Sequence, residues 1–306
     1  MRNSDILVNL KNKRIGVLYG GFSREREISI LSGKAVLNVL KKMKLDVCGI
    51  DVDRNIIKKI QRERIDIAYI ALHGSVGEDG AIQGMLEVLG ISYTGCGIFA
   101  SAASINKDIS KQLFKYANIL TPKWITLRKF DPVPNIKEYP VVVKPVSQGS
   151  ALGVTIANTA LLFVASVKKA FRYDKEIIIE QFVDGKEITV GVLNGEVLPI
   201  VEIIPKGKFY DFRSKYQKGG SEHVIPADIS DKASKIAQNY ANKIYRIFKC
   251  NAMCRVDMIV DKVDKVWVLE NNTIPGMTET SLLPDAGKAM GYDFENLVLK
   301  IIESAL

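Results

Sequence analysis

Oxygen-bearing side chains near the C-terminus follow a spacing that suits a divalent cation. Residues 255–260 and 266–272 are short runs rich in β-branched residues on either side of a charged turn, a pattern typical of a β-hairpin. Because side chains alternate between the two faces of a strand, Asp257, Glu270 and Asn272 can share one face. We therefore expect two carboxylates and one carboxamide to point the same way.

The pairing of the two strands follows if the turn is centred on the Val263–Asp264 bond. Asp257 then lies opposite Glu270, and Arg255 lies opposite Asn272. Opposed Cβ atoms of an antiparallel pair are about 4.5–5.5 Å apart, a gap that suits one or two cations. A surface hairpin whose charges face water is the alternative interpretation.

The ligand types favour Mg²⁺ or Mn²⁺ over zinc. Carboxylate and amide oxygens, without Cys or His in the set, are typical ligands of hard cations. Mg²⁺ bound in this way keeps coordination sites open for phosphate oxygens. The turn at Pro275-Gly276 places backbone beside the carboxylates, which favours a binding site over an exposed hairpin.

Length and composition describe an ordinary globular chain with room for two or three domains. The 306 residues are 47% hydrophobic and 25% charged. No stretch approaches the roughly 18 apolar residues of a membrane span, and the first residues lack the apolar segment of a signal peptide. We expect a cytoplasmic protein with no membrane partner. The four cysteines form no C-x-x-C pair, which favours reduced, buried thiols.

The net charge of +9 raises the hypothesis of a nucleic-acid partner. Lysines and arginines are scattered along the chain rather than gathered into one stripe interleaved with aromatic residues. Such a diffuse positive field attracts nucleotide phosphates and acidic metabolites equally well. We therefore expect small-molecule partners and no nucleic acid.

Strand and helix patterns alternate near the N-terminus, as in a small parallel sheet. Strands are predicted at residues 14–19, 46–52 and 65–72, and an amphipathic helix at 25–40. Ligands collect at the carboxyl ends of such strands. Two side chains fall there: Glu25, in the first helical turn, could cap the helix or receive an ammonium group, and His73 could be a ligand-binding or a structural histidine.

The pattern changes after residue 97. Helices cover 99–117, and a strand at 140–145 ends with Lys144 before a small-residue loop at 146–154. That loop could offer backbone N–H groups to phosphate beside the lysine charge, or be a plain hairpin turn. At the end of a strand at 176–180, Glu180 could read an adenine amino group.

A third sheet begins near residue 186. A hairpin at Asn194-Gly195 joins strands at 187–193 and 196–204. Residues 209–221 show neither the helical nor the strand periodicity and are a candidate for a lid over the site. A helix is predicted at 231–248, before the carboxylate hairpin, and another at 294–304, at the end of the chain.

These motifs, in this order, resemble the D-alanine–D-alanine ligases of the ATP-grasp superfamily over nearly the whole chain. The motifs are Gly-Gly-x-Ser-x-Glu-Arg-Glu from Gly20, Ala71-Leu72-His73-Gly74, Gly77-Glu78-Asp79-Gly80-x-x-Gln83-Gly84, Val143-Lys144-Pro145, Phe209-Tyr210-Asp211, Lys215-Tyr216, Arg255-x-Asp257 and Glu270-x-Asn272-Thr273-x-Pro275-Gly276-Met277-Thr278. The resemblance implies an α/β (α+β) fold of three domains. An N-terminal parallel-sheet domain (1–97) precedes two mainly antiparallel α+β domains (98–184 and 185–306).

The resemblance also implies the ligand sets. Divalent ions, Mg²⁺ or Mn²⁺ and two in number, would bind Asp257, Glu270 and Asn272. ATP would bind a larger set shared between the second and third domains, namely Lys107, Lys144, Glu180, Phe182, Val183, Glu187, Phe209 and Lys215.

By the same resemblance, Glu25 holds the ammonium of a first D-alanine and His73 lies near its carboxylate. Ser281, with Leu282 and Gly276, receives the carboxylate of the second D-alanine. The remaining catalytic residues are Ser150 and Tyr216, which form a network with Glu25, and Arg255, which stabilises the oxyanion.

The implied reaction passes through an acyl phosphate and makes D-alanyl-D-alanine for peptidoglycan, in an enzyme expected to be a homodimer. Tyr216 resembles the enzymes that use D-alanine, whereas phenylalanine there marks relatives that use D-lactate. Ala151 and Gln148 depart from residues common in the family. The alternatives are a related ligase with D-lactate or D-serine as second substrate, and a nucleotide-binding regulatory protein without turnover.

Overall fold

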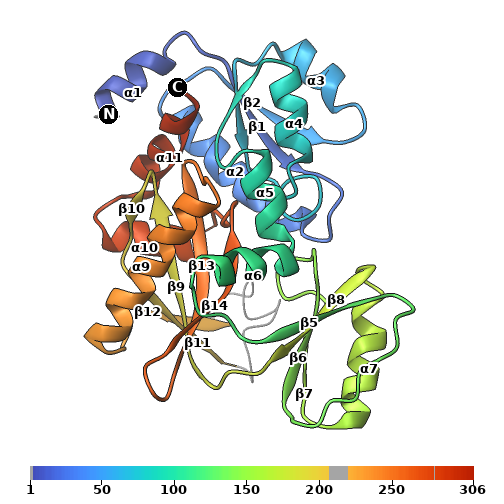
Figure 1. The fold of residues 1–306 in the computed structure, drawn as a ribbon. Coiled ribbons are helices and arrows are strands. Elements are labelled where there is room, and N and C mark those ends of the chain that lie inside the picture. The colour runs from blue at the N-terminus through green and yellow to red at the C-terminus, as the bar shows by residue number, and fades with distance from the viewer. Residues whose placement is uncertain (1–2, 207–219, 279) are drawn as a thin grey trace.

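The computed structural model describes residues 3–206, 220–278 and 280–306, which form three sheets (Figure 1). The first sheet is parallel throughout, with strand order β2-β1-β3-β4, and its members are β1 (Ile15–Gly20), β2 (Val47–Val52), β3 (Ile67–Ile70) and β4 (Ser92–Tyr93). Helices follow or connect these strands: α2 (Arg26–Lys42), α3 (Ile56–Glu63) and α4 (Ala81–Val88).

Both ends of the chain pack beside this first sheet. Helix α1 (Asn3–Leu10) contacts α11 (Phe294–Ile302), which ends in a short 3₁₀ turn, η1 (Glu303–Ala305). Ile6 and Leu10 of α1 are fully buried in a core that also holds residues of α11 and of α10 (Leu282–Ala289). The C-terminal helices are therefore fixed against the N-terminal sheet.

The second sheet is antiparallel, with strand order β5-β8-β6-β7, and one helix covers it. Its members are β5 (Trp124–Arg128), β6 (Val141–Pro145), β7 (Thr155–Ala157), α7 (Ala160–Ala170) and β8 (Glu176–Gln181). Figure 1 shows this unit at the end of the molecule away from β1 and β2. It packs around a small core of its own that includes Val143, Phe163 and Ile177.

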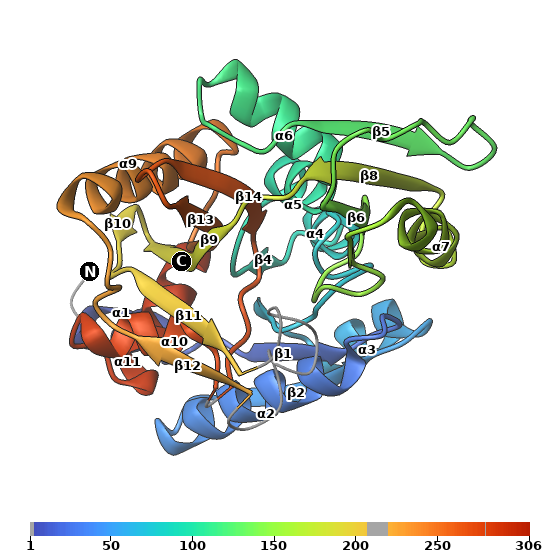
Figure 2. The ribbon, with the colours of Figure 1, turned by 90° about the horizontal axis from the view of Figure 1, so that it is seen from below.

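The third sheet is also antiparallel, with strand order β12-β11-β9-β13-β14 and with β10 paired to β9. Its members are β9 (Gly185–Leu193), β10 (Glu196–Val197), β11 (Val201–Pro205), β12 (Ser221–Val224), β13 (Met253–Asp261) and β14 (Val266–Asn272). Helix α9 (Asp231–Ile247) covers one face, as Figure 2 shows. The three sheets confirm the predicted fold class, a parallel-sheet unit followed by two antiparallel ones.

One local prediction was wrong in detail. The strand predicted over 196–204 is broken into β10 and β11, because Pro199 has no N–H to continue the ladder and Leu198 N–H turns to Gly191 O (2.9 Å). The helices predicted over 99–117 are confirmed as α5 (Ile98–Ile105) and α6 (Lys107–Tyr116), separated by Asn106, whose side chain accepts a hydrogen bond from Ile109 N–H.

The predicted register of the β13–β14 hairpin is confirmed. Asp257 lies opposite Glu270 and Arg255 opposite Asn272, but a β-bulge follows Asp257, so that Met258 pairs with Val268. The turn is therefore centred on Val263 rather than on the bond after it. The one extra residue that the bulge adds to β14 accounts for this shift of the turn centre by half a residue.

Helices α5 and α6 share their core with the third sheet. Ala100, Ala103 and Phe114 pack in one cluster with Val190, Val256 and other strand residues.

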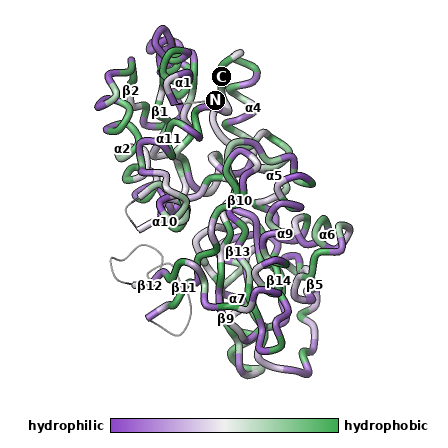
Figure 3. The backbone as a smooth tube through the Cα atoms, turned by 90° about the vertical axis from the view of Figure 1, so that its left-hand side faces the viewer, coloured by the Kyte–Doolittle hydropathy of each residue, from purple (hydrophilic) through white to green (hydrophobic). Residues whose placement is uncertain are grey.

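Figure 3 shows short hydrophobic and hydrophilic stretches alternating along the chain. Among the described residues, no helix has the length and apolar character needed to cross a membrane.

Asp261 closes the hairpin turn and generates a prediction about pH. Its side chain accepts bonds from Val263 N–H, Lys265 N–H and Trp267 Nε1–H, each 2.9 Å long. Burial opposes the ionised form, yet these hydrogen bonds hold the pKa of Asp261 below its usual value of 3.8. Stability from this carboxylate is therefore full above about pH 4 and is lost as the pH falls through the lower folded-state pKa.

Urea unfolding of the wild type and of Asp261→Ala measures this contribution. We expect the variant to unfold at lower urea at pH 7, with the gap between the two proteins narrowing as the pH is lowered below 4. A gap that stays constant or widens on acidification would show that the ionised carboxylate does not stabilise the turn.

Candidate active site

Two cavities meet between the sheets. The larger, of about 410 Å³, lies between the second and third sheets, and the smaller, of about 70 Å³, lies toward the first sheet. Lys107 and Glu270 line both cavities. A ligand in one cavity would therefore meet a ligand in the other at these two side chains.

The larger cavity gathers most of the residues predicted to bind ATP. Its size falls within the range of ligand pockets, about 300–1,000 Å³. Its lining includes Lys107, Lys144, Glu180, Phe182, Val183, Glu187, Asp257 and Glu270. Two further predicted residues, Phe209 and Lys215, lie outside the described residues.

Glu180 is a buried carboxylate held between two lysines. Lys144 Nζ lies 2.8 Å from Oε1, and Lys111 Nζ lies 2.8 Å from Oε2. Burial alone would raise the pKa of Glu180, but the positive charges of Lys144 and Lys111 outweigh it and hold the pKa below its usual value. Glu180 is therefore an acceptor of hydrogen bonds at neutral pH.

The carboxylates of the β13–β14 hairpin, Asp257 and Glu270, form ion pairs with Arg255 and Lys107. The Arg255 guanidinium holds Asp257 at two points, Nε to Oδ1 (2.9 Å) and Nη2 to Oδ2 (2.8 Å). Thr189 Oγ1 donates to the same Oδ1 at 2.6 Å, and Lys107 Nζ lies 3.5 Å from Glu270 Oε2. The hairpin thus brings two carboxylates to the place where the cavities meet.

This donor set fits a magnesium-like cation that is completed by ligand oxygens. Among residues 3–206, 220–278 and 280–306, no three His, Cys, Asp or Glu side chains gather as a metal cage. Mg²⁺ is usually bound by one or two carboxylates together with substrate phosphates and water. Asp257 and Glu270 supply the carboxylates, and Asn272, whose Oδ1 accepts from Ile274 N–H (3.0 Å), supplies an amide beside them.

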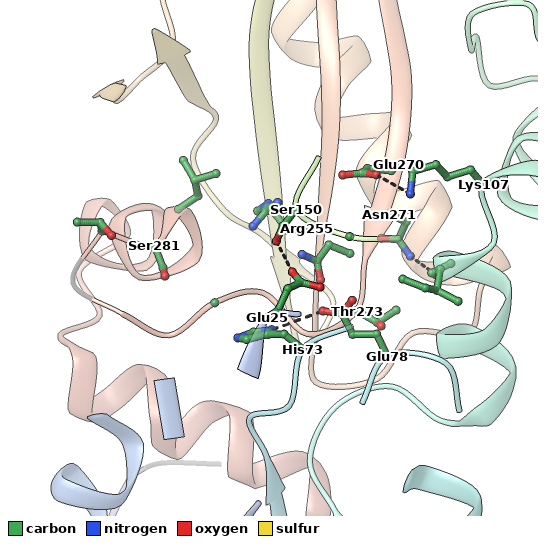
Figure 4. A pocket seen from close by; sticks show the side chains of 17 residues that line it. Glu25, His73, Glu78, Lys107, Ser150, Arg255, Glu270, Asn271, Thr273 and Ser281 are labelled. Carbon is green, nitrogen blue, oxygen red and sulfur yellow. Dashed lines mark hydrogen bonds and ion pairs between the residues drawn. The ribbon is translucent and has the colours of Figure 1, made fainter. Parts of the chain in front are cut away.

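The smaller cavity contains a buried carboxylate, Glu25, at the N-terminus of α2 (Figure 4). Ser150 Oγ–H donates to Glu25 Oε1, and Glu25 N–H donates to Ser23 Oγ at 3.1 Å. A Cβ atom at Gly74 would lie 2.7 Å from Glu25 Oε2, and one at Gly149 would lie 3.0 Å away. Glycine at both positions therefore makes room for this carboxylate, which could receive an ammonium group.

His73 is part of a buried polar chain in the same cavity. Its Nδ1 lies 3.5 Å from Glu78 Oε1, and its Nε2 lies 3.3 Å from Ser32 Oγ, which accepts from Met277 N–H at 3.2 Å. Figure 4 shows His73, Glu25 and Glu78 close together. The chain joins the end of β3 to the segment that follows β14.

Ser281 precedes helix α10 and lines the smaller cavity together with Gly276 and Leu282. Its Oγ accepts from Thr278 N–H at 3.0 Å, and a Cβ atom at Gly276 would lie 2.8 Å from that oxygen. The N-terminus of a helix favours an anion. A carboxylate could therefore bind at this end of the cavity.

The structure places the predicted residues in two groups. Glu25, His73, Ser150, Arg255, Asn272, Gly276, Ser281 and Leu282 line the smaller cavity, whereas the described members of the nucleotide set line the larger one. Tyr216 lies outside the described residues.

Sequence reasoning missed the roles of Lys111, Ser32 and Asn271, whose Nδ2 donates to Ser104 Oγ at 2.9 Å. The spacing of Lys111, four residues after Lys107 on one helix, was the only available signal for it.

Known proteins resemble this chain over most of its length. The family model for the D-Ala D-Ala ligase C-terminus matches residues 107–303, and the model for the N-terminus matches residues 53–96. A curated D-alanine–D-alanine ligase of Citrifermentans bemidjiense is 44% identical over 296 residues and covers 97% of each chain. One of Carboxydothermus hydrogenoformans is also 44% identical, over 303 residues, covering 94% of this chain and 97% of its own.

Solved structures agree with these sequence matches. The D-alanine–D-alanine ligase of Bacillus anthracis, solved in complex with ATP, has a TM-score of 0.84 and 34% identity, and the match covers 96% of this chain and 97% of that one. A D-Ala:D-Ser ligase of Enterococcus faecalis has a TM-score of 0.81 and 29% identity, covering 97% of this chain and all of its own. The chain belongs to the D-alanine–D-alanine ligase family.

Proposed function

We propose that this protein joins two D-alanines, at the expense of ATP, to make D-alanyl-D-alanine for peptidoglycan. One observation carries the proposal: a nucleotide-sized cavity and a small polar cavity meet at Lys107 and Glu270. A reaction between a triphosphate and a small carboxylate requires such a junction. The names of the relatives and the ATP complex of the B. anthracis enzyme support the choice of substrates.

The nucleotide would lie in the larger cavity, between the proposed domains 98–184 and 185–306. The base would lie near Glu180, Phe182 and Val183, and the phosphates near Lys107 and Lys144. Lys107 Nζ donates to Gln148 O at 2.7 Å, which fixes the small-residue loop beside the phosphate position. Glu187, Phe209 and Lys215 complete the proposed nucleotide set.

Two divalent ions, Mg²⁺ or Mn²⁺, would be held by Asp257, Glu270 and Asn272. When bound, they neutralise the charge of the phosphates during phosphoryl transfer. The chain's own contribution is to aim these ligands at the junction and to balance their charge with Arg255 and Lys107. These two cations offset the repulsion between the two carboxylates.

The first D-alanine would lie in the smaller cavity, to which domain 1–97 contributes Glu25, His73 and Glu78. Glu25 would receive its ammonium group, and His73 would lie near its carboxylate. A carboxylate oxygen of this D-alanine attacks the γ-phosphorus, and the bond to the bridging oxygen of ADP breaks, giving an acyl phosphate. Ser150 and Tyr216 would hold Glu25 in place for this step.

The second D-alanine would be bound by its carboxylate at Ser281, Leu282 and Gly276. Its amine attacks the acyl carbon, and phosphate leaves as the peptide bond forms. Arg255 would stabilise the oxyanion of the tetrahedral intermediate by donating hydrogen bonds into a site with little water. We further propose that the enzyme is cytoplasmic, since the reaction requires a compartment that holds ATP. We also propose that it is a homodimer, as the family resemblance implies.

The acceptor can be tested directly, because a structural neighbour is named as a D-Ala:D-Ser ligase. We expect phosphate release from ATP in the presence of D-alanine and formation of the D-alanyl-D-alanine dipeptide, detected by mass spectrometry. L-Alanine serves as the stereochemical control and should give no product. If the enzyme preferred D-serine or D-lactate as the second substrate, that molecule would replace D-alanine as the proposed acceptor. If D-alanine caused no phosphate release, the protein would instead be a nucleotide-binding regulatory protein without turnover.

The carboxylate role can be tested with Glu270→Gln. Removing one charge at the junction should lower kcat by about 100-fold or more, the usual cost of losing a preorganised electrostatic contact. Asp264→Asn is the matched control, because Asp264 is an exposed carboxylate in the turn of the same hairpin. The control should retain activity, and both variants should unfold at the wild-type temperature. Near-normal turnover by Glu270→Gln would contradict the metal assignment.

A further inference from the structure

Lys111 is a buried charge that the proposed reaction does not use. It lies on α6, one helical turn after Lys107, and its side chain has no exposed surface. Glu180 lines the larger cavity, whereas Lys111 lies behind it and contacts Oε2 at 2.8 Å. Among the described residues that line the cavity, Lys111 contacts Glu180 and Pro122, and of these two Glu180 alone carries a charge.

Three groups fix the position of the Lys111 ammonium. Its Nζ donates to Thr121 Oγ1 at 2.7 Å and to Pro122 O at 3.4 Å, and it lies 5.5 Å from the centre of the Trp124 ring. Burial lowers the pKa of Lys111, although the charge of Glu180 opposes that change. A buried ion pair of this kind is weak support for stability, because apolar residues of similar volume often stabilise a fold equally well. A functional reason for the charge is therefore worth testing.

We propose that Lys111 is a positioning residue that keeps the Glu180 carboxylate ionised and oriented, so that the larger cavity selects a purine with a 6-amino group over one with a 6-carbonyl group. The proposal rests on the proposed function, which places a nucleotide in that cavity. An ionised carboxylate only accepts hydrogen bonds, so it matches the amino group of adenine. It repels the carbonyl of guanine, to which a protonated carboxyl group could donate.

Lys144 cannot replace Lys111 in this role. Lys144 Nζ contacts the other oxygen of Glu180, but the side chain also lines the cavity at the proposed phosphate position. Its charge would be shared with the phosphates once a nucleotide is bound. The charged groups that face Glu180 are Lys111 from α6 and Lys144 from β6, and Glu270 of β14 acts on Lys111 from farther away.

The direction of the pH effect follows from burial. In the wild type, the pKa of Glu180 lies below its usual value of 4.5, so the carboxylate is ionised throughout pH 6–9. In Lys111→Met, one of the two cations is lost while burial still opposes the charge, so the pKa of Glu180 rises. The ionised fraction, and with it the preference for adenine, should then increase with pH.

The test compares the binding of Mg²⁺-ADP and Mg²⁺-GDP to the whole enzyme by titration calorimetry over pH 6–9. The wild type should prefer ADP by a ratio that does not change with pH. Lys111→Met should lose about tenfold or more of that preference at pH 6 and regain part of it at pH 9. Lys111→Arg, which keeps the charge, and Lys115→Met, which removes an exposed lysine one turn further along α6, should resemble the wild type. A wild-type ratio in Lys111→Met at every pH would overturn the proposal.

The double variant Lys111→Met/Glu180→Gln guards against a variant that fails to fold, because it removes both buried charges together. If Lys111 acts through Glu180, the double variant should show the same ADP-to-GDP ratio as Glu180→Gln alone. A further loss in the double variant would show that Lys111 acts by another route, which would overturn the proposal.

Failure of the proposed function gives a different result. In that case the enzyme still binds ADP in preference to GDP, and this preference still depends on Lys111, but D-alanine gives no dipeptide. A wild type that binds neither nucleotide would overturn the positioning role as well.

Discussion

The pairing register of β13 and β14 is the constraint on which the site depends. Because side chains alternate between faces with a period of two, a slip of one residue would turn Asp257, Glu270 and Arg255 away from the cavities. The bulge after Asp257 and the turn closed by Asp261 hold that register from both ends. The middle of the hairpin is also fixed by β9, which pairs with β13 along its whole length.

One half-buried and one buried charge pair connect the elements around this hairpin. Lys107 and Lys111 of α6 reach Glu270 of β14 and Glu180 of β8, and each pair joins parts of the chain that are far apart in sequence. Carboxylates that are removed from water require such partners to remain ionised. The arrangement thus holds acidic side chains ready for cations and donors, while the apolar cores beneath them supply the stability.

Much of the site was predictable because it obeys short-range rules. The hairpin register follows from period-two alternation and the turn, and the positions of Glu25 and His73 follow from the carboxyl ends of parallel strands. What could not be predicted depends on packing between distant segments. The burial of Lys111 behind Glu180, the pairing of His73 with Ser32 and Glu78, and the docking of α1 on α11 have no local signal. The division of the helical region at Asn106 was visible only as a capping residue at the end of an apolar run.

The central claim is that the two hairpin carboxylates gather divalent ions at the junction of the cavities. Anomalous diffraction from crystals grown with Mn²⁺ and an ATP analogue measures this directly. We expect manganese peaks at about 2.0–2.3 Å from oxygens of Asp257, Glu270 and Asn272 and from phosphate oxygens of the analogue. A bound nucleotide with no manganese near these side chains, or with manganese bound elsewhere, would contradict it.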